Sequence, residues 1–352
     1  MTTVTRKKLV YAAISLFVSA VLIAYLFTKT SFSDLTRMLA GIYLPALGAF
    51  LGISLVAVGL RAWRAKMLLA PQPIGWKDIV LVTLIRNCLD DLLPARIGAL
   101  SYIYVLNQRL GFPFETAAST FAVGIVYDFL TLGPFLIIAV IVAGAGVSGI
   151  PSFALFAVAA GYLAATALVL WKIVPLARFL LRVFVAALEA FKADHKKGAT
   201  ASIEKLQKTI TGLQDIRARK IDAPLFVQSF LIRFCKYAAI FFLLWALLKN
   251  RGVGLSQLGF LKMILGVTAA EMTAFLPIRG LAGFGTWESA WALAFGLMAL
   301  PLELAVVSGL GLHLLTNLWE YGLGLLAILV LEIPLLRARR ARLRNPGDAG
   351  NR

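Results

Sequence analysis

Long apolar stretches, separated by shorter polar segments, run along most of the chain. Six of these stretches carry at most two charged residues each. All six reach roughly the length of about 20 residues that a helix needs to cross a bilayer. They cover residues 9–27, 39–60, 117–145, 152–171, 224–248 and 304–331. This pattern predicts an all-α integral membrane protein, a polytopic helical bundle with about six full spans.

Two further apolar stretches, at about 79–106 and 260–300, are interrupted by residues that a lipid-facing helix does not tolerate. Proline removes a backbone hydrogen bond, and arginine is costly in the hydrocarbon core. Two half-helices that meet at the break and turn back fit each stretch better than one straight span. Such a hairpin requires surrounding protein or a water-filled cavity. The sequence therefore predicts two re-entrant broken-helix hairpins beside the spans.

The basic residues predict how this bundle lies in the membrane. The chain has 35 Lys+Arg against 17 Asp+Glu, which gives a formal net charge of +18. The main basic groups lie at 6–8, 61–66, 173–223 and 337–342. Cytoplasmic loops carry an excess of Lys and Arg, so both termini are predicted to be cytoplasmic, in the cell (inner) membrane. The first hairpin then enters from the cytoplasm and the second from outside, as in an inverted repeat.

The same pattern predicts the domain boundaries. Residues 1–335 are expected to form one transmembrane domain, and 336–352 a basic cytoplasmic tail. Within the domain, 173–223 is a basic cytoplasmic segment. Its first part mixes Leu, Phe and Val with Arg, which predicts a helix lying at the membrane interface. A soluble nucleic-acid-binding protein is excluded, because 60% of the residues are hydrophobic and only 15% are charged.

One short phrase occurs in both interrupted stretches. Leu93–Gly98 (LPARIG) corresponds to Leu276–Gly283 (LPIRGLAG). Membrane proteins that break two helices at corresponding places usually build a binding site near the bilayer midplane. The half-helix after each break points free N–H groups into that site, and a neighbouring arginine makes it an anion site. The alternative is that each arginine only caps the preceding half-helix. The residues predicted to bind substrate at the breaks are Arg96, Gly98, Arg279 and Gly283.

Arg233 and Lys236 lie three residues apart on one helix face, close to the middle of the span 224–248. One interpretation is that both cations face the cavity and hold a phosphate headgroup. The other is that they pair with nearby acids and contact no substrate. The acids considered as such partners are Asp128, Glu271, Glu288 and Glu320.

Several acidic residues lie within the apolar stretches. Asp91 and Glu288 are predicted to contact substrate. Four others are candidates for counter-ions or for groups that couple transport to proton binding: Asp128, Glu271, Asp90 and Glu320. Asp90 also lies four residues after Arg86 and could pair with it. His313, Asn317 and Glu320 share one helix face, for which hydrogen bonding in the core is the expected explanation. Because His and Cys are few and scattered, neither a metal site nor a cofactor is expected.

Three motifs carry a resemblance to a known family. They are Asn87–Gly98 (NCLDDLLPARIG), Val126–Leu130 (VYDFL) and Leu276–Glu288 (LPIRGLAGFGTWE). In this order they resemble the flippase-like transmembrane family found in the N-terminal half of lysylphosphatidylglycerol synthases, the multiple peptide resistance factor proteins. The similarity covers about residues 8–335. It implies lipid translocation or a related lipid-handling role, and a stand-alone member without the aminoacyl transferase domain.

The chain departs from the family pattern at two positions. Many relatives have an acidic residue directly after the glycine of the first motif, where this chain has Ala99. Many also have an arginine three residues further on, where Tyr102 stands. If these positions handle substrate in relatives, either the substrate here differs, or Asp90 and Asp91 take over the role.

The leading functional hypothesis is translocation of an anionic lipid, or of a lipid linked through polyprenyl phosphate, between leaflets. The headgroup would be held by arginines near the midplane. A second hypothesis is a membrane partner or anchor of a lipid-modifying enzyme or glycosyltransferase. A lipid-linked transferase is a third hypothesis, but no catalytic motif supports it, so the chain is not expected to be an enzyme. Nucleic acid is not expected as a partner, whereas a homo-oligomer is compatible with the sequence.

Overall fold

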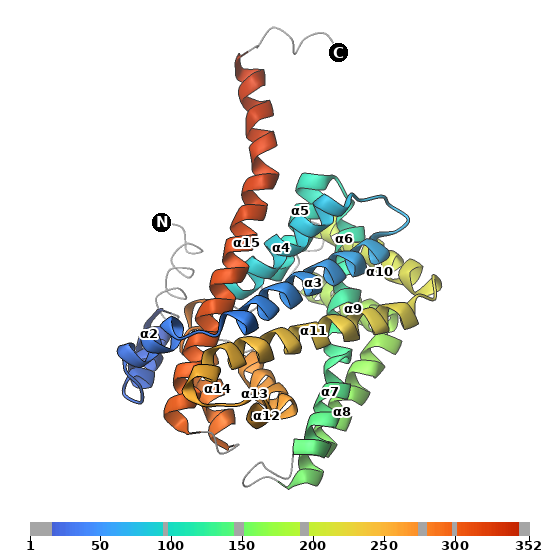
Figure 1. Cartoon of the computed structure of the whole chain (residues 1–352). Helices are drawn as coiled ribbons and strands as arrows, with labels where there is room; N and C mark the ends of the chain where they lie inside the picture. Colours follow the sequence, from blue (N-terminus) through green and yellow to red (C-terminus); the bar gives the residue numbers. More distant parts are fainter. Residues whose placement is uncertain are drawn as a thin grey trace.

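Helices make up all the secondary structure in the described part of the chain, as the computed structural model shows (Figure 1). The structure describes residues 16–93, 98–143, 151–190, 197–273, 280–297 and 301–344. The helices from the N-terminal half are α2 (Phe32–Ala40), α3 (Leu44–Leu69), α4 (Trp76–Leu92), α5 (Ser101–Leu110), α6 (Phe114–Leu130), α7 (Leu132–Ala143), α8 (Ser152–Trp171) and α9 (Ile173–Ala190). Those that follow are α10 (Lys197–Ala218), α11 (Asp222–Leu248), η3 (Lys249–Arg251), α12 (Leu255–Leu258), α13 (Phe260–Met272), η5 (Leu281–Gly283), α14 (Thr286–Leu297) and α15 (Leu302–Arg344).

Five of the helical segments are long and apolar enough to cross a membrane. They are Leu44–Leu69, Phe114–Ile141, Ser152–Trp171, Asp222–Arg251 and Leu302–Glu332. A sixth span results if Leu16–Phe27 and Phe32–Ala40, which meet at an angle of 82°, are counted together. This confirms the prediction of an all-α polytopic membrane protein.

Three of these helices begin directly after a proline, where a missing N–H costs no helical hydrogen bond: α6 after Pro113, α8 after Pro151 and α15 after Pro301.

The two spans α3 and α11 run antiparallel and side by side, and they form the frame of the domain (Figure 1). At one end, the backbone N–H of Tyr43 donates to the carbonyl of Ala246 at 2.9 Å. At the other end, Arg219 Nη1 donates to the carbonyl of Leu68 at 3.0 Å. These contacts define a Leu44 end and a Leu69 end of the pair.

The first interrupted stretch folds back on itself at the Leu69 end. α4 ends at Leu92 and α5 begins at Ser101, and the two helices pack against each other. Ile79 near the start of α4 and Leu106 near the end of α5 share one core cluster with Leu69. The hairpin therefore starts and returns at the same end of the frame, as the break predicts.

The second interrupted stretch forms a hairpin at the Leu44 end. α13 ends at Met272, α14 begins at Thr286, and Gly266 of α13 lies so close to Phe295 of α14 that an added Cβ would meet its ring at 2.2 Å. Arg251 and Pro301, which flank this hairpin, line one small pocket together with Arg37 of α2. The two hairpins thus enter from opposite ends of the α3–α11 pair. Their tips touch, because η5 contacts α4.

Three further helices, α9, α10 and α15, complete the description. α9, in the segment expected at the membrane interface, leaves Phe179, Leu180 and Val183 more than half exposed, with exposed fractions of 55%, 57% and 51%. α10 packs on α6. α15 passes the whole frame and continues as a helix to Arg344, into the stretch predicted as a basic tail (Figure 1).

The packing of α15 on α4 generates a prediction. A Cβ at Gly324 would lie 2.1 Å from Cys88 Cβ and 3.3 Å from the carbonyl oxygen of Leu84. Gly324→Ala must therefore push the helices apart, which costs about 1–3 kcal/mol. We expect the melting temperature of the detergent-solubilised protein to fall. The control is Gly322→Ala, because a Cβ at that position meets nothing within 4 Å. Equal melting temperatures for the two variants would contradict this packing.

Candidate functional site

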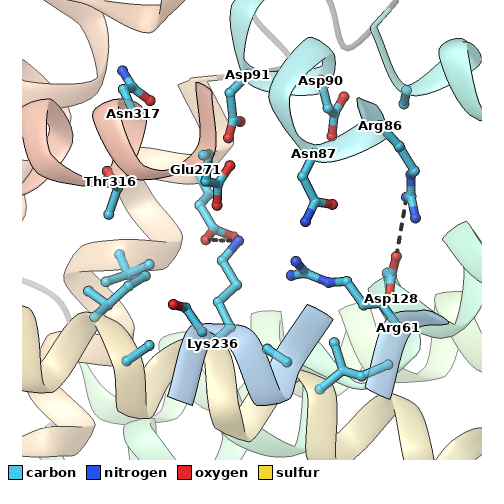
Figure 2. A pocket seen from close by; sticks show the side chains of 18 of the residues that line it. Arg61, Arg86, Asn87, Asp90, Asp91, Asp128, Lys236, Glu271, Thr316 and Asn317 are labelled. Atoms are coloured by element: carbon cyan, nitrogen blue, oxygen red, sulfur yellow. Dashed lines mark ion pairs between the residues drawn. The ribbon is translucent and has the colours of Figure 1, made fainter. Parts of the chain in front are cut away.

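A cavity of about 580 Å³ lies where the tips of the two hairpins meet. The first hairpin contributes Asp90 and Asp91 from α4, and the second contributes Glu271 and Gly283. The spans α3, α6, α11 and α15 supply the remaining walls. Figure 2 shows that charged and amide side chains from these different elements point toward one another across this space.

Arg61 of α3 reaches into the middle of the cavity, toward the amide of Asn87 (Figure 2). Its guanidinium forms no ion pair or hydrogen bond with any residue that the structure describes. A guanidinium has five N–H donors and stays charged under all physiological conditions. The cavity therefore contains a positive charge with free donors, which is what an anionic group requires.

The neighbouring cations contact Asp128 of α6. Arg64, only 3% exposed, places Nη1 2.6 Å from Asp128 Oδ1 and also donates to Ser229 Oγ at 2.8 Å. Arg86 of α4 lies 3.7 Å from Asp128 Oδ2. Arg233 of α11 donates to the backbone carbonyl of Asp128. Asp128 is thus the counter-ion of Arg64 and Arg86, one of the roles considered for it.

Lys236 forms an ion pair with Glu271, with Nζ and Oε1 2.6 Å apart (Figure 2). The pair joins α11 to α13 just before the second break. Glu271 is one of the partners considered for Lys236. Both residues also line the cavity, as does Arg233. Because Glu271 is the next-to-last residue of α13, this contact restrains where the second hairpin ends.

One carboxyl group at the tip of the first hairpin, that of Asp91, contacts α15. Glu320 of α15 hydrogen-bonds the side chain of Asp91. Asp90, Asp91 and Glu320 all line the cavity. The contact between Asp91 and Glu320 connects the first hairpin with the last span. Within the described part of the chain, no group of three or more His, Cys, Asp or Glu side chains is arranged to hold a metal ion.

Glu288 lies behind the cavity wall and supports the second tip. It is fully buried, and its Oε2 accepts the backbone N–H of Gly285 at 2.8 Å. Its Oε1 lies 2.6 Å from His313 Nδ1 on α15. Its neighbours in the second hairpin, Trp287 and Gly283, do line the cavity. Gly283 has a φ of +82°, a conformation that glycine adopts without strain.

The two arginines of the repeated phrase, Arg96 and Arg279, lie outside the described residues. Gly98 is described and buried, and a Cβ there would lie 1.5 Å from the carbonyl oxygen of Leu89. No side chain larger than hydrogen fits this place, so Gly98 allows the break to fold onto α4. The role that the structure shows for Gly98 is therefore structural.

Arg61 and Asn87 are the cavity residues that the hydropathy pattern misses. The span expected at 39–60 begins at Leu44 and continues to Leu69. Arg61 and Arg64 therefore lie inside the helix and not in a cytoplasmic loop after it. The available signal was the return of apolar residues at Met67, Leu68 and Leu69, which extends the span past the charges.

Comparison with known proteins agrees with this architecture. Residues 12–324 match the family model described as lysylphosphatidylglycerol synthase TM region. No curated protein matches the chain. The match covers most of the chain, including both hairpins and every residue discussed at the cavity. The chain therefore belongs to the lysylphosphatidylglycerol synthase TM region family, which supports a lipid-related function in a membrane.

Proposed function

We propose that the protein moves a lipid with a phosphate-bearing headgroup between the two leaflets, and that the headgroup passes through the cavity between the hairpin tips. The observation that carries the proposal is Arg61, a cation that forms no ion pair or hydrogen bond with any described residue, in a cavity inside the membrane domain. Glu320 and Asp128 act on it only as charges at longer range. A cation at this depth costs about 2.5–3.5 kcal/mol on insertion scales. A phosphate group offsets this cost when it binds.

The other charged groups support an anion at Arg61. Asp128 is engaged by Arg64 and Arg86, and Glu271 is engaged by Lys236. An anion beside Arg61 thus meets a guanidinium with free donors, while Asp128 and Glu271 are each paired with a cation. Arg96 and Arg279 remain predicted contributors to the same anion site.

Two half-exposed apolar side chains supply a route for the acyl chains. Leu100, next to the first break, and Met272, next to the second, both line the cavity. Their exposed fractions are 50% and 40%. A lipid could thus keep its tails against these residues, in the bilayer, while its headgroup enters the polar interior. In this proposal, one hairpin tip faces each leaflet, because the two hairpins enter from opposite ends of the α3–α11 pair.

The proposal includes a cytoplasmic N-terminus in the inner membrane, on the strength of the basic segments. It is a proposal of transport and not of catalysis. Asp128 and Glu271, held in ion pairs, are poorly placed as free general bases.

A second candidate function, an anchor for a lipid-modifying enzyme or glycosyltransferase, is favoured by the exposed apolar residues Phe179, Leu180 and Val183 of α9. Pull-down of such an enzyme by the wild type and its loss in a Phe179→Ser, Val183→Ser variant would support this role. Unchanged pull-down by the variant would count against it.

Arg61→Gln tests the transport proposal. Removing a charged hydrogen-bond donor costs about 1.5–3 kcal/mol, so we expect leaflet exchange of anionic lipids in proteoliposomes to fall about ten- to a hundredfold. Arg61→Lys should retain part of the activity, since it keeps the charge but not the planar donor group. Arg37→Gln is the control, because Arg37 is a 71% exposed residue paired with Asp34 outside the cavity. Exchange by Arg61→Gln at the level of Arg37→Gln, across a broad panel of anionic lipids, would sink the proposal.

Asp128→Asn tests the role of the counter-ion. Without the carboxylate, Arg64 stays buried with an uncompensated charge, which costs about 3–5 kcal/mol. We expect a large drop in melting temperature in detergent. Glu204→Gln breaks only the exposed pair with Lys208, for which a loss of about 1 kcal/mol or less is expected. A drop no larger for Asp128→Asn than for Glu204→Gln would show that the pair at Asp128 does not stabilise the domain.

A further inference from the structure

His313 and Glu288 form a buried polar pair beside the cavity that the phosphate site at Arg61 does not use. His313 of α15 lines the cavity, and Glu288 of α14 lies behind it. Only 7% of His313 and none of Glu288 is exposed. The sequence pattern explains His313 by hydrogen bonding in the core. The partners of its two ring nitrogens therefore decide the interpretation.

The first ring nitrogen, Nδ1, contacts the buried carboxylate. It lies 2.6 Å from Glu288 Oε1, while Glu288 Oε2 accepts the backbone N–H of Gly285 at 2.8 Å. Trp287 and Phe284 pack against the ring, with centroids 5.0 and 4.6 Å away, and hold its orientation. An ionised carboxylate only accepts hydrogen bonds, so we assign the proton of the neutral imidazole to Nδ1. Nε2 is then left with a lone pair.

The second ring nitrogen, Nε2, has no hydrogen-bond partner in the described part of the chain. Gly283 of the second hairpin, which also lines the cavity, leaves this edge of the ring open. A Cβ at Gly283 would lie 3.5 Å from Cε1 and 3.7 Å from Nε2 of His313. Hydrogen bonding in the core therefore accounts for Nδ1 but not for Nε2. A histidine in this setting can take up a proton at Nε2 from water in the cavity.

Glu288 makes such a proton affordable inside the domain. Burial disfavours an imidazolium, but a carboxylate at 2.6 Å compensates its charge. The other charged groups on the helices around His313 are engaged with one another or lie across the cavity. They are Asp91 of α4 with Glu320 of α15, Lys236 of α11 with Glu271, Arg86 of α4 with Asp128, Asp34 with Arg37 of α2, and Asp90, Arg233 and Arg61 on the cavity wall.

We propose that His313 is a proton-binding site of the cavity, so that a proton enters together with the anionic headgroup. The proton passes from cavity water to Nε2, and Nδ1–H stays on Glu288. The pair then has no net charge, and Nε2–H replaces a lone pair with a donor. This inference rests on the proposed function, in which Arg61 binds the phosphate, and it names the proton as the ion that accompanies the lipid.

The direction of the pH dependence follows from this change of charge. Without the proton, the lone pair on Nε2 and the charge of Glu288 oppose an anion in the cavity. With the proton, both effects are removed, so anion and proton strengthen each other's binding by the same factor. Lipid affinity therefore rises as the pH falls. Arg61 and the phosphodiester keep their charges over this range and cannot produce the effect.

The first test is calorimetric binding of short-chain phosphatidylglycerol to the purified protein in a zwitterionic detergent. We expect the wild type to bind about five- to tenfold more tightly at pH 5.5 than at pH 8.5, at the lower end of typical coupling. Titrations in two buffers with different ionisation enthalpies count the protons, and a net uptake is expected on binding. Equal affinity at the two pH values, or no uptake between them, would overturn the proton site.

Matched variants identify the group that takes up the proton. His313→Asn keeps a donor for Glu288 and removes the titrating nitrogen, so its affinity should be the same at both pH values. The control is His195→Gln, which removes the other of the two histidines of the chain and should keep the pH dependence. The Asp91–Glu320 pair is the alternative proton site. A pH dependence that persists in His313→Asn and disappears in Glu320→Gln would assign the proton there and overturn the inference.

Nuclear magnetic resonance of histidine labelled with 15N tests the wild type without a substitution in the cavity. Two sets of ring signals are expected, and His195→Gln assigns them. At alkaline pH, His313 should carry its proton on Nδ1. At a fixed pH where it is partly protonated, phosphatidylglycerol should increase the protonated fraction and phosphatidylcholine should not. A bare Nδ1, or a protonated fraction that phosphatidylglycerol leaves unchanged, would contradict the proposal.

Failure of this inference is distinguishable from failure of the proposed function. If Arg61→Gln weakens phosphatidylglycerol binding at both pH values, the phosphate site stands. Absence of a pH dependence in the wild type then overturns the proton site alone. If Arg61→Gln binds as tightly as the wild type, the phosphate site is overturned, and the proton site falls with it.

Discussion

Moving a cation out of water costs several kcal/mol unless an anion compensates it, and the centre of this membrane domain depends on one such compensation at Asp128. The carboxylate forms ion pairs with Arg64 of α3 and Arg86 of α4, and the backbone carbonyl of the same residue accepts a hydrogen bond from Arg233 of α11. Asp128 itself belongs to α6. Four helices from distant parts of the chain thus meet at one residue, and apolar packing alone would not select this arrangement.

Polar contacts of the same kind hold the two hairpin tips. Lys236 of α11 pairs with Glu271 at the end of α13, and Glu320 of α15 hydrogen-bonds Asp91 at the end of α4. Each tip is thus attached to a span on the wall of the cavity. In the proposed function, a phosphate beside Arg61 acts on these pairs through a medium of low dielectric, where charges interact strongly. Headgroup binding and the positions of the tips are then coupled, as alternating access between leaflets requires.

Hydropathy predicts the spans well because a helix in lipid must satisfy every backbone group internally, which needs a long apolar run. The helix breaks can also be predicted from nearby residues, because proline and glycine interrupt a helix at their own positions. α4 ends one residue before Leu93 and α13 ends four residues before Leu276, both close to the repeated phrase. The ends of the spans are harder to predict. α3 runs nine residues past the expected end at residue 60, because Arg61 and Arg64 find compensation or a cavity inside the bundle.

The amino-acid sequence by itself determined the helical class, the long apolar spans and the two interruptions, because each depends on residues that are neighbours along the chain. Only the tertiary structure decided which charges neutralise one another. Asp128 is 64 residues from Arg64 and 105 from Arg233, and no local pattern encodes pairing over such separations. The same holds for Arg61, which forms no direct ion pair with a described residue. It faces the cavity because of how α3 is rotated against α11, and that rotation follows from contacts along the whole length of both helices.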